Sequence, residues 1–135
     1  MTTVTLAGKE YPMSFSLMAA KKIAKEHGSI QKFFDGIDTE DVTENAIEKI
    51  IYVIDILINQ GCAYKNYFEK DVPPPKDAPV IDGKWTPMPS EVLGLAITFE
   101  NIGELYDKIS ECMGKDTKRK VETVGGEGKE KASQE

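Results

Sequence analysis

The stretch Ala46 to Ile58, A-I-E-K-I-I-Y-V-I-D-I-L-I, is the most apolar part of the chain and decides its fold. Its last nine residues contain a single charged side chain, Asp55. A helix this apolar has to be covered by other elements of the fold or by a partner. Apolar residues recur here at intervals of three and four, the spacing that lines one helix face: Val42, Ala46, Ile50, Val53, Ile54, Leu57 and Ile58.

Capping residues set the expected ends of this helix. Thr39 supplies a hydroxyl suited to an N-cap and Gly61 is a common helix stop, so we expect a helix of about 20 residues. The β-branched run Ile50 to Ile54 leaves a buried strand as the alternative, but the two end signals favour the helix. A membrane span is not expected, because it requires about 18 apolar residues without a charge and Asp55 interrupts the run.

Length and charge limit the broad class of the protein. With 135 residues, 40% of them hydrophobic, the chain has room for one domain with one core. The formal charge of -6 argues against nucleic acid and anionic membrane as partners. Residues 114–135 hold six basic and five acidic residues and almost no apolar ones, so we expect one folded domain over 1–114 and a disordered tail over 115–135.

A hairpin and two short helices are expected before the central helix. Alternating apolar residues from Thr2 to Leu17, with Gly8 between them, predict a β-hairpin. Ser16 is suited to cap a helix that ends at Gly28, and Ser29 then restarts the chain as a short helix, I-Q-K-F-F-D. The first of these helices is expected to run through Leu17, Met18, Ala20, Ile23 and Ala24 to His27, with its lysines pointing outward.

A proline-rich connector and a last pair of helices follow the central helix. Residues 71–89 contain six of the seven prolines, which predicts an extended connector without a helix or central strand. A helical region then opens at Ser90, breaks near Thr98 and ends at Gly114. The expected fold is therefore α+β and mainly α, with the N-terminal β-hairpin packed on a small bundle of four to five helices.

The residues that usually carry chemistry are few and scattered. His27 is the one histidine and precedes a helix stop, where its charge would suit the helix dipole. Cys62 and Cys112 lie fifty positions apart, which fits neither a zinc site nor a disulfide framework. Asp55 could acquire a raised pKa in its apolar run, but such a residue more often lies at a helix rim or meets a lysine. We therefore expect no catalytic, cofactor-binding or metal-binding residues, and a protein that works by interaction and is not an enzyme.

Four segments resemble the tail assembly chaperones of long-tailed bacteriophages and prophages. The first is V-T-L-A-G-K-E-Y-P-M-S-F-S-L-M-A-A-K-K-I-A-K-E-H-G, Val4 to Gly28, which is similar to the family's opening of two short strands and a helix with a lysine-rich face. The resemblance continues loosely through the helix Glu44 to Gln60, and returns in W-T-P-M-P-S-E-V-L-G-L, Trp85 to Leu95, and in the helix Asn101 to Met113. The chain departs from the family in the proline-rich stretch Asp71 to Gly83, where relatives often turn quickly.

This resemblance implies that the protein binds the tape measure protein in the host bacterial cytoplasm and assists polymerisation of the tail tube. It also implies that the protein is absent from the mature virion. In that family a fraction of ribosomes changes frame near the end of the gene and adds a second domain, which contacts the tail tube protein. Gly128-Lys129 is the dipeptide that a G-G-G-A-A-A slippery run encodes, which makes it the expected frameshift position.

We expect the client to bind aromatic side chains from segments that are least able to bury all of them: Phe33, Phe34, Tyr64, Phe68 and Trp85. Two other functions stay open. The net acidity of residues 1–113, with 11 basic and 18 acidic residues, would also suit a small acidic inhibitor or DNA mimic. A binding subunit of an unrelated bacterial complex has no feature against it, and the sequence leaves self-association as a homo-oligomer open.

Overall fold

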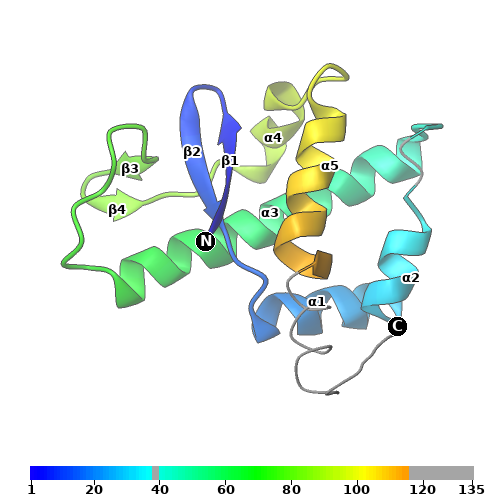
Figure 1. Ribbon diagram of the computed structural model, residues 1–135, viewed down its shortest axis with the longest axis horizontal. Coiled ribbons are helices and arrows are strands. Elements are labelled where there is room, and N and C mark those ends of the chain that lie inside the picture. Colours follow the sequence, from blue (N-terminus) through cyan, green and yellow to red (C-terminus); the bar gives the residue numbers. More distant parts are fainter. Residues whose placement is uncertain (38–39, 116–135) are drawn as a thin grey trace.

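A computed structural model describes residues 1–37 and 40–115 of the chain (Figure 1). Within these residues the fold is mainly helical, with one hairpin at the N-terminus and a second, shorter one in the connector. The expected α+β, mainly α class is thus confirmed. Of the tail expected over 115–135, Lys115 belongs to a π-helical turn and residues 116–135 lie outside the described residues. The elements are β1 (Thr2–Leu6), β2 (Lys9–Met13), α1 (Leu17–His27), α2 (Ile30–Asp35), α3 (Glu44–Phe68), β3 (Val80–Ile81), β4 (Lys84–Trp85), α4 (Ser90–Ala96), α5 (Ile102–Ser110) and a π-helical turn (Glu111–Lys115).

The central helix α3 is longer than expected and both of its ends are displaced. Its N-cap is Thr43, whose hydroxyl accepts a hydrogen bond from the amide of Ala46 at 3.1 Å, while Thr39 lies outside the described residues. The helix also continues past Gly61 to Phe68, giving 25 residues in all. The prediction of a stop at Gly61 was wrong because this glycine serves a close contact with β2 inside the helix.

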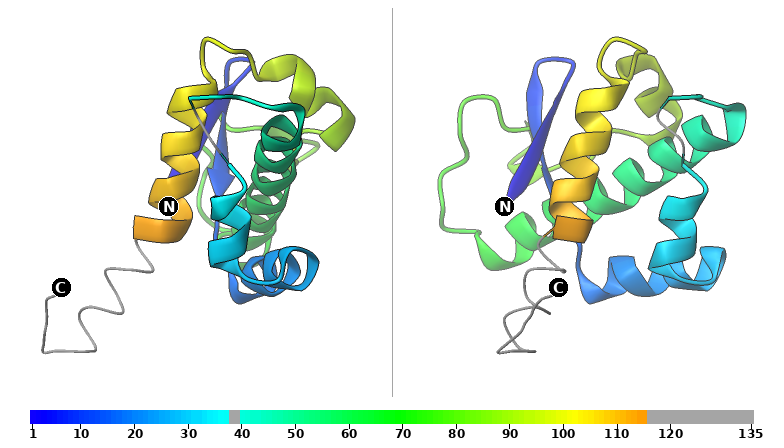
Figure 2. Two further views of the ribbon diagram at one scale, coloured as in Figure 1. Left: turned by 90° about the vertical axis from the view of Figure 1, so that its right-hand side faces the viewer. Right: turned by 45° about the vertical axis from the view of Figure 1, so that its right-hand side comes forward.

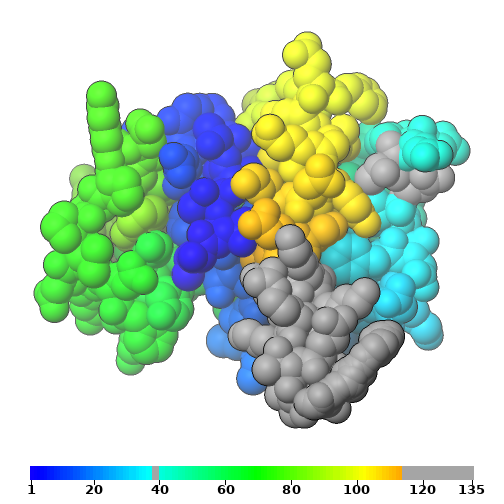
Figure 3. All heavy atoms as spheres, in the orientation of Figure 1, coloured from blue at the N-terminus to red at the C-terminus, as the bar shows by residue number. Residues whose placement is uncertain are grey.

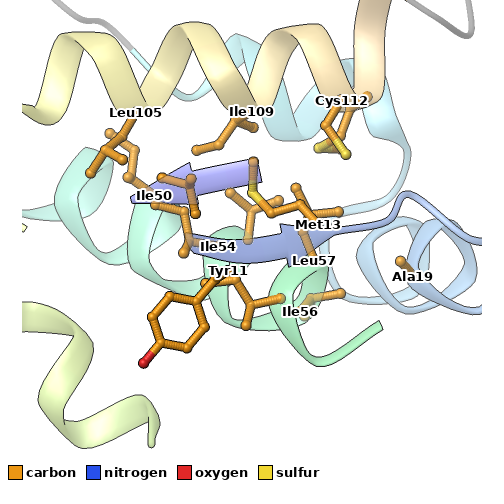
Figure 4. Packing of buried hydrophobic residues seen from close by; sticks show 14 of the residues in the cluster. Tyr11, Met13, Ala19, Ile50, Ile54, Ile56, Leu57, Leu105, Ile109 and Cys112 are labelled. Atoms are coloured by element: carbon orange, nitrogen blue, oxygen red, sulfur yellow. The ribbon is translucent and has the colours of Figure 1, made fainter. Parts of the chain in front are cut away.

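The N-terminal hairpin is an antiparallel pair in which Val4 lies opposite Tyr11. Its two turn residues, Ala7 and Gly8, both have positive φ (51° and 82°), as a two-residue hairpin turn of the type I′ class requires. The hairpin lies between two helices, with β2 along α3 and β1 along α5. Figure 4 shows the buried side chains at this junction, with Met13 of the hairpin facing those of α3 and α5.

Serine caps begin α1 and α2 as the sequence predicts. The Ser16 hydroxyl accepts from the amide of Ala19 at 3.1 Å, and the Ser29 hydroxyl accepts from the amide of Lys32 at 3.0 Å. Gly28 ends α1 with φ of 90°. The helix runs from Leu17 to His27 with its lysines exposed, as expected. Its buried residues are Ala19 and Ile23, whereas Leu17 and Met18 are 89% and 73% exposed.

The connector over residues 71–89 is more structured than an extended chain. It forms a short hairpin, β3–β4, whose turn residues Asp82 and Gly83 both have positive φ. The amide of Glu10 donates to the carbonyl oxygen of Asp77 at 2.9 Å, which fixes the connector to the edge of β2. Asp-Gly between two short strands is a strong hairpin signal, and the prediction of an extended connector was wrong over residues 80–85. In Figure 3 this segment and the C-terminal end of α3 together form the green lobe at one end of the molecule.

The last two helices meet at the expected break. α4 ends at Ala96, and Asn101 precedes α5 while its side-chain oxygen accepts from the amide of Thr98 at 2.7 Å. The helical region does not stop at Gly114 but passes into the π-helical turn Glu111–Lys115. Figure 2 shows α4 and α5 packed against the first half of α3, on the side of the hairpin away from the connector.

Candidate partner-binding surfaces

Three aromatic residues at the C-terminal end of α3 form one exposed cluster, which we call the aromatic surface. Tyr64, Tyr67 and Phe68 are 42%, 73% and 68% exposed. The ring centroids of Tyr64 and Phe68 are 5.0 Å apart, and those of Tyr67 and Phe68 are also 5.0 Å apart. Because adjacent large rings are rarely left in water without a role, this surface is the first candidate for partner binding.

The position of these rings follows from the length of α3. The buried residues of the helix end at Cys62, where the hairpin ends its contact with α3. The last turns extend beyond this cover, so positions 64, 67 and 68, which share a face at spacings of three and four, remain exposed. Sequence reasoning selected Tyr64 and Phe68 but omitted Tyr67, although its spacing from Tyr64 places it on the same face.

Charged side chains surround the aromatic surface. Lys65 pairs with Glu69 at 2.9 Å and lies 5.4 Å from the centre of the Trp85 ring. Lys70 lies 5.6 Å from the centre of the Tyr67 ring. Cations at these distances are attracted to the aromatic face, so Lys70 stabilises the Tyr67 ring of the aromatic surface and Lys65 stabilises the Trp85 ring.

Trp85 reaches this end of α3 through a polar clamp. The side-chain amide of Asn66 donates to the carbonyl oxygen of Trp85 and accepts from its amide, both at 2.8 Å. The indole is half-buried against the core. A pocket of about 610 Å³ lies between the connector and the end of α3, with Trp85, Val72 and Lys65 in its wall. Trp85 therefore lies beside the aromatic surface while its ring stabilises the connector.

Phe33 and Phe34 lie elsewhere, so the five aromatic residues selected from the sequence do not form one site. Phe33 is completely buried, 5.1 Å from the His27 ring and 5.5 Å from the Phe34 ring. Phe34 is half-buried and meets the edge of Tyr106 at 6.4 Å. The expectation that Phe33 contacts a partner is corrected, because in this structure the ring belongs to the core.

A second apolar feature is an open pocket between α3, α4 and α5, with a volume of about 230 Å³. Ile50 lies at its buried base, and Phe99 is exposed at its rim. Gly94 of α4 faces the side chain of Ile51 across the pocket. The apolar side chains that line it are Ile47, Ile50, Ile51, Ile97, Phe99 and Ile102.

The residues that sequence reasoning considered for chemistry are held apart. The His27 ring packs edge-on against Phe33 and Tyr52, each at 5.1 Å. Burial raises the pKa of the Cys62 thiol to about 11. Burial also raises the pKa of Asp55, and Lys22 and the Asn59 amide, which donates to its carboxylate at 3.1 Å, oppose that effect.

A metal-binding group and a membrane-spanning helix are both absent from the part of the chain that the structure describes. Within residues 1–37 and 40–115, no three His, Cys, Asp or Glu side chains come together as a metal-binding group. No helix of this part of the chain is both long and apolar enough to cross a membrane. The expected frameshift position, Gly128-Lys129, lies outside the described residues. Comparison of the chain with protein-family models, with curated proteins and with solved structures found no match.

Proposed function

We propose that this protein is a tail assembly chaperone of a long-tailed bacteriophage or prophage. In this proposal it binds the tape measure protein in the host cytoplasm, keeps it from aggregating and holds it ready for assembly of the tail tube. The sequence segments Val4 to Gly28, Trp85 to Leu95 and Asn101 to Met113 support the family. A longer form with an added domain, made by frameshifting at Gly128-Lys129, would contact the tail tube protein.

The aromatic surface is the observation that carries this proposal. Tyr64, Tyr67 and Phe68 offer adjacent rings that can cover the apolar face of a client helix. Aromatic side chains give a large contact area for little loss of conformational freedom, and for this reason they dominate binding energies at protein interfaces. The net charge of -6 would keep the complex in solution while the client is held.

Co-expression with the tape measure protein tests the proposal. The variant Tyr67→Ala/Phe68→Ala removes two rings of the aromatic surface. As a matched control, Leu17→Ala/Met18→Ala removes two apolar side chains of α1 that are at least as exposed. We expect the unaltered protein and the control to increase the amount of client in the soluble fraction and to co-purify with it. The aromatic variant should lose both effects while keeping its melting temperature.

Two results would contradict the proposal. If the unaltered protein leaves client solubility unchanged, it is not a chaperone for that client. If the aromatic variant protects the client as well as the control does, binding does not depend on Tyr67 and Phe68. The frameshift is tested separately from the nucleotide sequence, because a chain without a homopolymeric run at codons 128 and 129 cannot change frame there by slippage.

A further inference from the structure

The pocket between α3, α4 and α5 is distinct from the aromatic surface. Its base at Ile50 and the centre of the aromatic surface near Asn66 are 16 residues apart on α3, or roughly 24 Å at the rise of an α-helix. A single side chain of a partner cannot reach both. The pocket therefore needs an occupant of its own.

The size of the pocket favours side chains over a whole small molecule. Its volume is about 230 Å³, whereas a cavity of roughly 150 Å³ already holds a benzene ring and sites for drug-sized ligands begin at roughly 300 Å³. One large or two medium apolar side chains would fill it. Its open mouth, with Phe99 exposed at the rim, suits side chains that project from a helix lying across it.

The charged residues in the segments that border the pocket are all negative. The segments 44–48 on α3 and 90–101 on the α4–α5 side hold four acidic and no basic residues. All four carboxylates are exposed: Glu44, Glu48, Glu91 and Glu100. The next residue on α3, Lys49, does not neutralise them, because it lies about 200° around the helix from Ile47 and its side chain extends toward Gly36.

We propose that this pocket binds a helical segment of a partner protein that carries two neighbouring apolar side chains flanked by lysine or arginine. The apolar pair enters the pocket, and the basic residues meet the acidic rim, which selects against helices with acidic flanks. The inference rests on the proposed function in taking that segment to be part of the client. The pocket would then choose which segment of a long helical client is held.

Two synthetic helical peptides test this selection on the full-length protein. Both carry the same leucine pair, and the flanking positions are lysine in one and glutamate in the other. We expect the lysine peptide to bind at least about tenfold more tightly at low salt, with a difference that shrinks as salt screens the rim. Equal binding of the two peptides, or no binding of either, would overturn the inference.

Variants then locate the binding. Gly94→Leu places a side chain in the pocket, and Gly94→Ala is its control, since a Cβ at this position makes only an ordinary contact of 3.7 Å with Ile51. Should Gly94→Leu fail to fold, Glu48→Gln/Glu91→Gln removes two rim charges without adding volume. Both Gly94→Leu and Glu48→Gln/Glu91→Gln should lose the preference for the lysine peptide, whereas Gly94→Ala should keep it.

The aromatic variant Tyr67→Ala/Phe68→Ala separates this inference from the proposed function. It should bind the lysine peptide normally, because the pocket is unchanged. If it loses the peptide while Gly94→Leu keeps it, the peptide binds at the aromatic surface and the pocket inference is wrong. If peptide binding follows the pocket variants but the client stays insoluble, the pocket inference stands and the chaperone proposal falls.

Discussion

Gly61 of α3 lies against the backbone carbonyl group of Pro12 in β2, so closely that a Cβ placed on Gly61 would overlap that group. The same Cβ would lie 2.9 Å from the amide nitrogen of Met13. This close approach allows the amide of Ser14 to donate to the carbonyl oxygen of Leu57 at 3.0 Å, which ties the end of the hairpin directly to the helix. The hairpin and α3 therefore depend on each other through a position where a side chain cannot fit.

The first prediction follows from this contact. Gly61→Ala should lower the free energy of unfolding by about 1–3 kcal/mol, because the added methyl group pushes β2 away from α3. Helix propensity alone predicts the opposite effect, an increase of roughly 0.5–1 kcal/mol in the free energy of unfolding. Urea denaturation followed by circular dichroism distinguishes the two, and a more stable Gly61→Ala variant would show that the contact is absent.

Gly94→Ala is predicted to have the opposite effect. Gly94 is exposed in α4, and a Cβ there meets only the Ile51 side chain at 3.7 Å. With no clash to oppose it, the gain in helix propensity should raise the free energy of unfolding by about 0.5–1 kcal/mol. The same denaturation experiment measures it, and a loss of stability would mean that α4 is not helical at this position.

Ile54 is predicted to be essential for the core. Its side chain is completely buried in α3, so Ile54→Ala should cost about 2–5 kcal/mol, a large part of the stability of a domain of this size. Ile81→Ala in the connector is the matched control, since Ile81 is 61% exposed and its removal should change stability by less than about 0.5 kcal/mol. Similar losses for the two variants would contradict the assigned burial.

Asn66→Ala is predicted to release the connector from α3. The two hydrogen bonds between Asn66 and the backbone of Trp85 each contribute about 1 kcal/mol net, and the variant removes both. Limited proteolysis should then cut within residues 71–89 faster, while the hairpin and α3 stay folded. Thr86→Ala, which removes a local hydrogen bond to Lys84, is the control and should be cut at the normal rate.

Cys62 is predicted to make stability fall at alkaline pH. Burial raises the pKa of its thiol from 9.0 to about 11 in the folded protein. The unfolded chain therefore loses this proton first as the pH rises, which favours unfolding between about pH 9 and pH 11. Burial raises the pKa of nearby Tyr11 as well, and the Cys62 thiolate adds to that effect.

The variant Cys62→Ala isolates this contribution. It should lose less of its unfolding free energy than the unaltered protein does between about pH 8 and pH 10, as measured by urea denaturation at each pH. Its lower stability at neutral pH, caused by the smaller side chain, does not affect that comparison. An identical pH dependence for the two proteins would show that the thiol is not buried in solution.

Local signals predicted the small elements well. Ser16, Gly28 and Ser29 act within one or two turns of their own position, so the beginning and end of α1 and the beginning of α2 could be assigned from neighbouring residues. The expected break near Thr98 is local in the same way.

Features that depend on distant parts of the chain were harder to predict. Gly61 has the sequence signature of a helix stop, and only the approach of Pro12, 49 positions earlier, explains why it lies inside α3. The exposure of Leu17 and Met18 likewise depends on how α1 packs on the rest of the fold. The connector hairpin is a different case, because Asp82-Gly83 is a local turn signal that predicts it, although the prolines around it favour an extended chain.

The candidate site was predictable only in part for the same reason. Tyr64 and Phe68 share a helix face and could be grouped by spacing, and Tyr67 follows by the same rule. Whether Phe33 or Phe34 reaches the surface depends on α5 and His27, which pack against them from other segments. The pocket around Gly94 needs three helices to exist, so no single stretch of sequence indicates it.

Because α3 runs without interruption from Glu44 to Phe68, surfaces on its two halves keep a constant distance from each other. The helix fixes the distance between the pocket and the aromatic surface, the two surfaces proposed to bind the client. A long client helix running alongside could engage both, and the second contact would then form at the high effective concentration that tethering provides. Client fragments too short to reach both surfaces would bind at only one of them and dissociate quickly. Under this proposal the affinity would therefore depend on the length of the client helix.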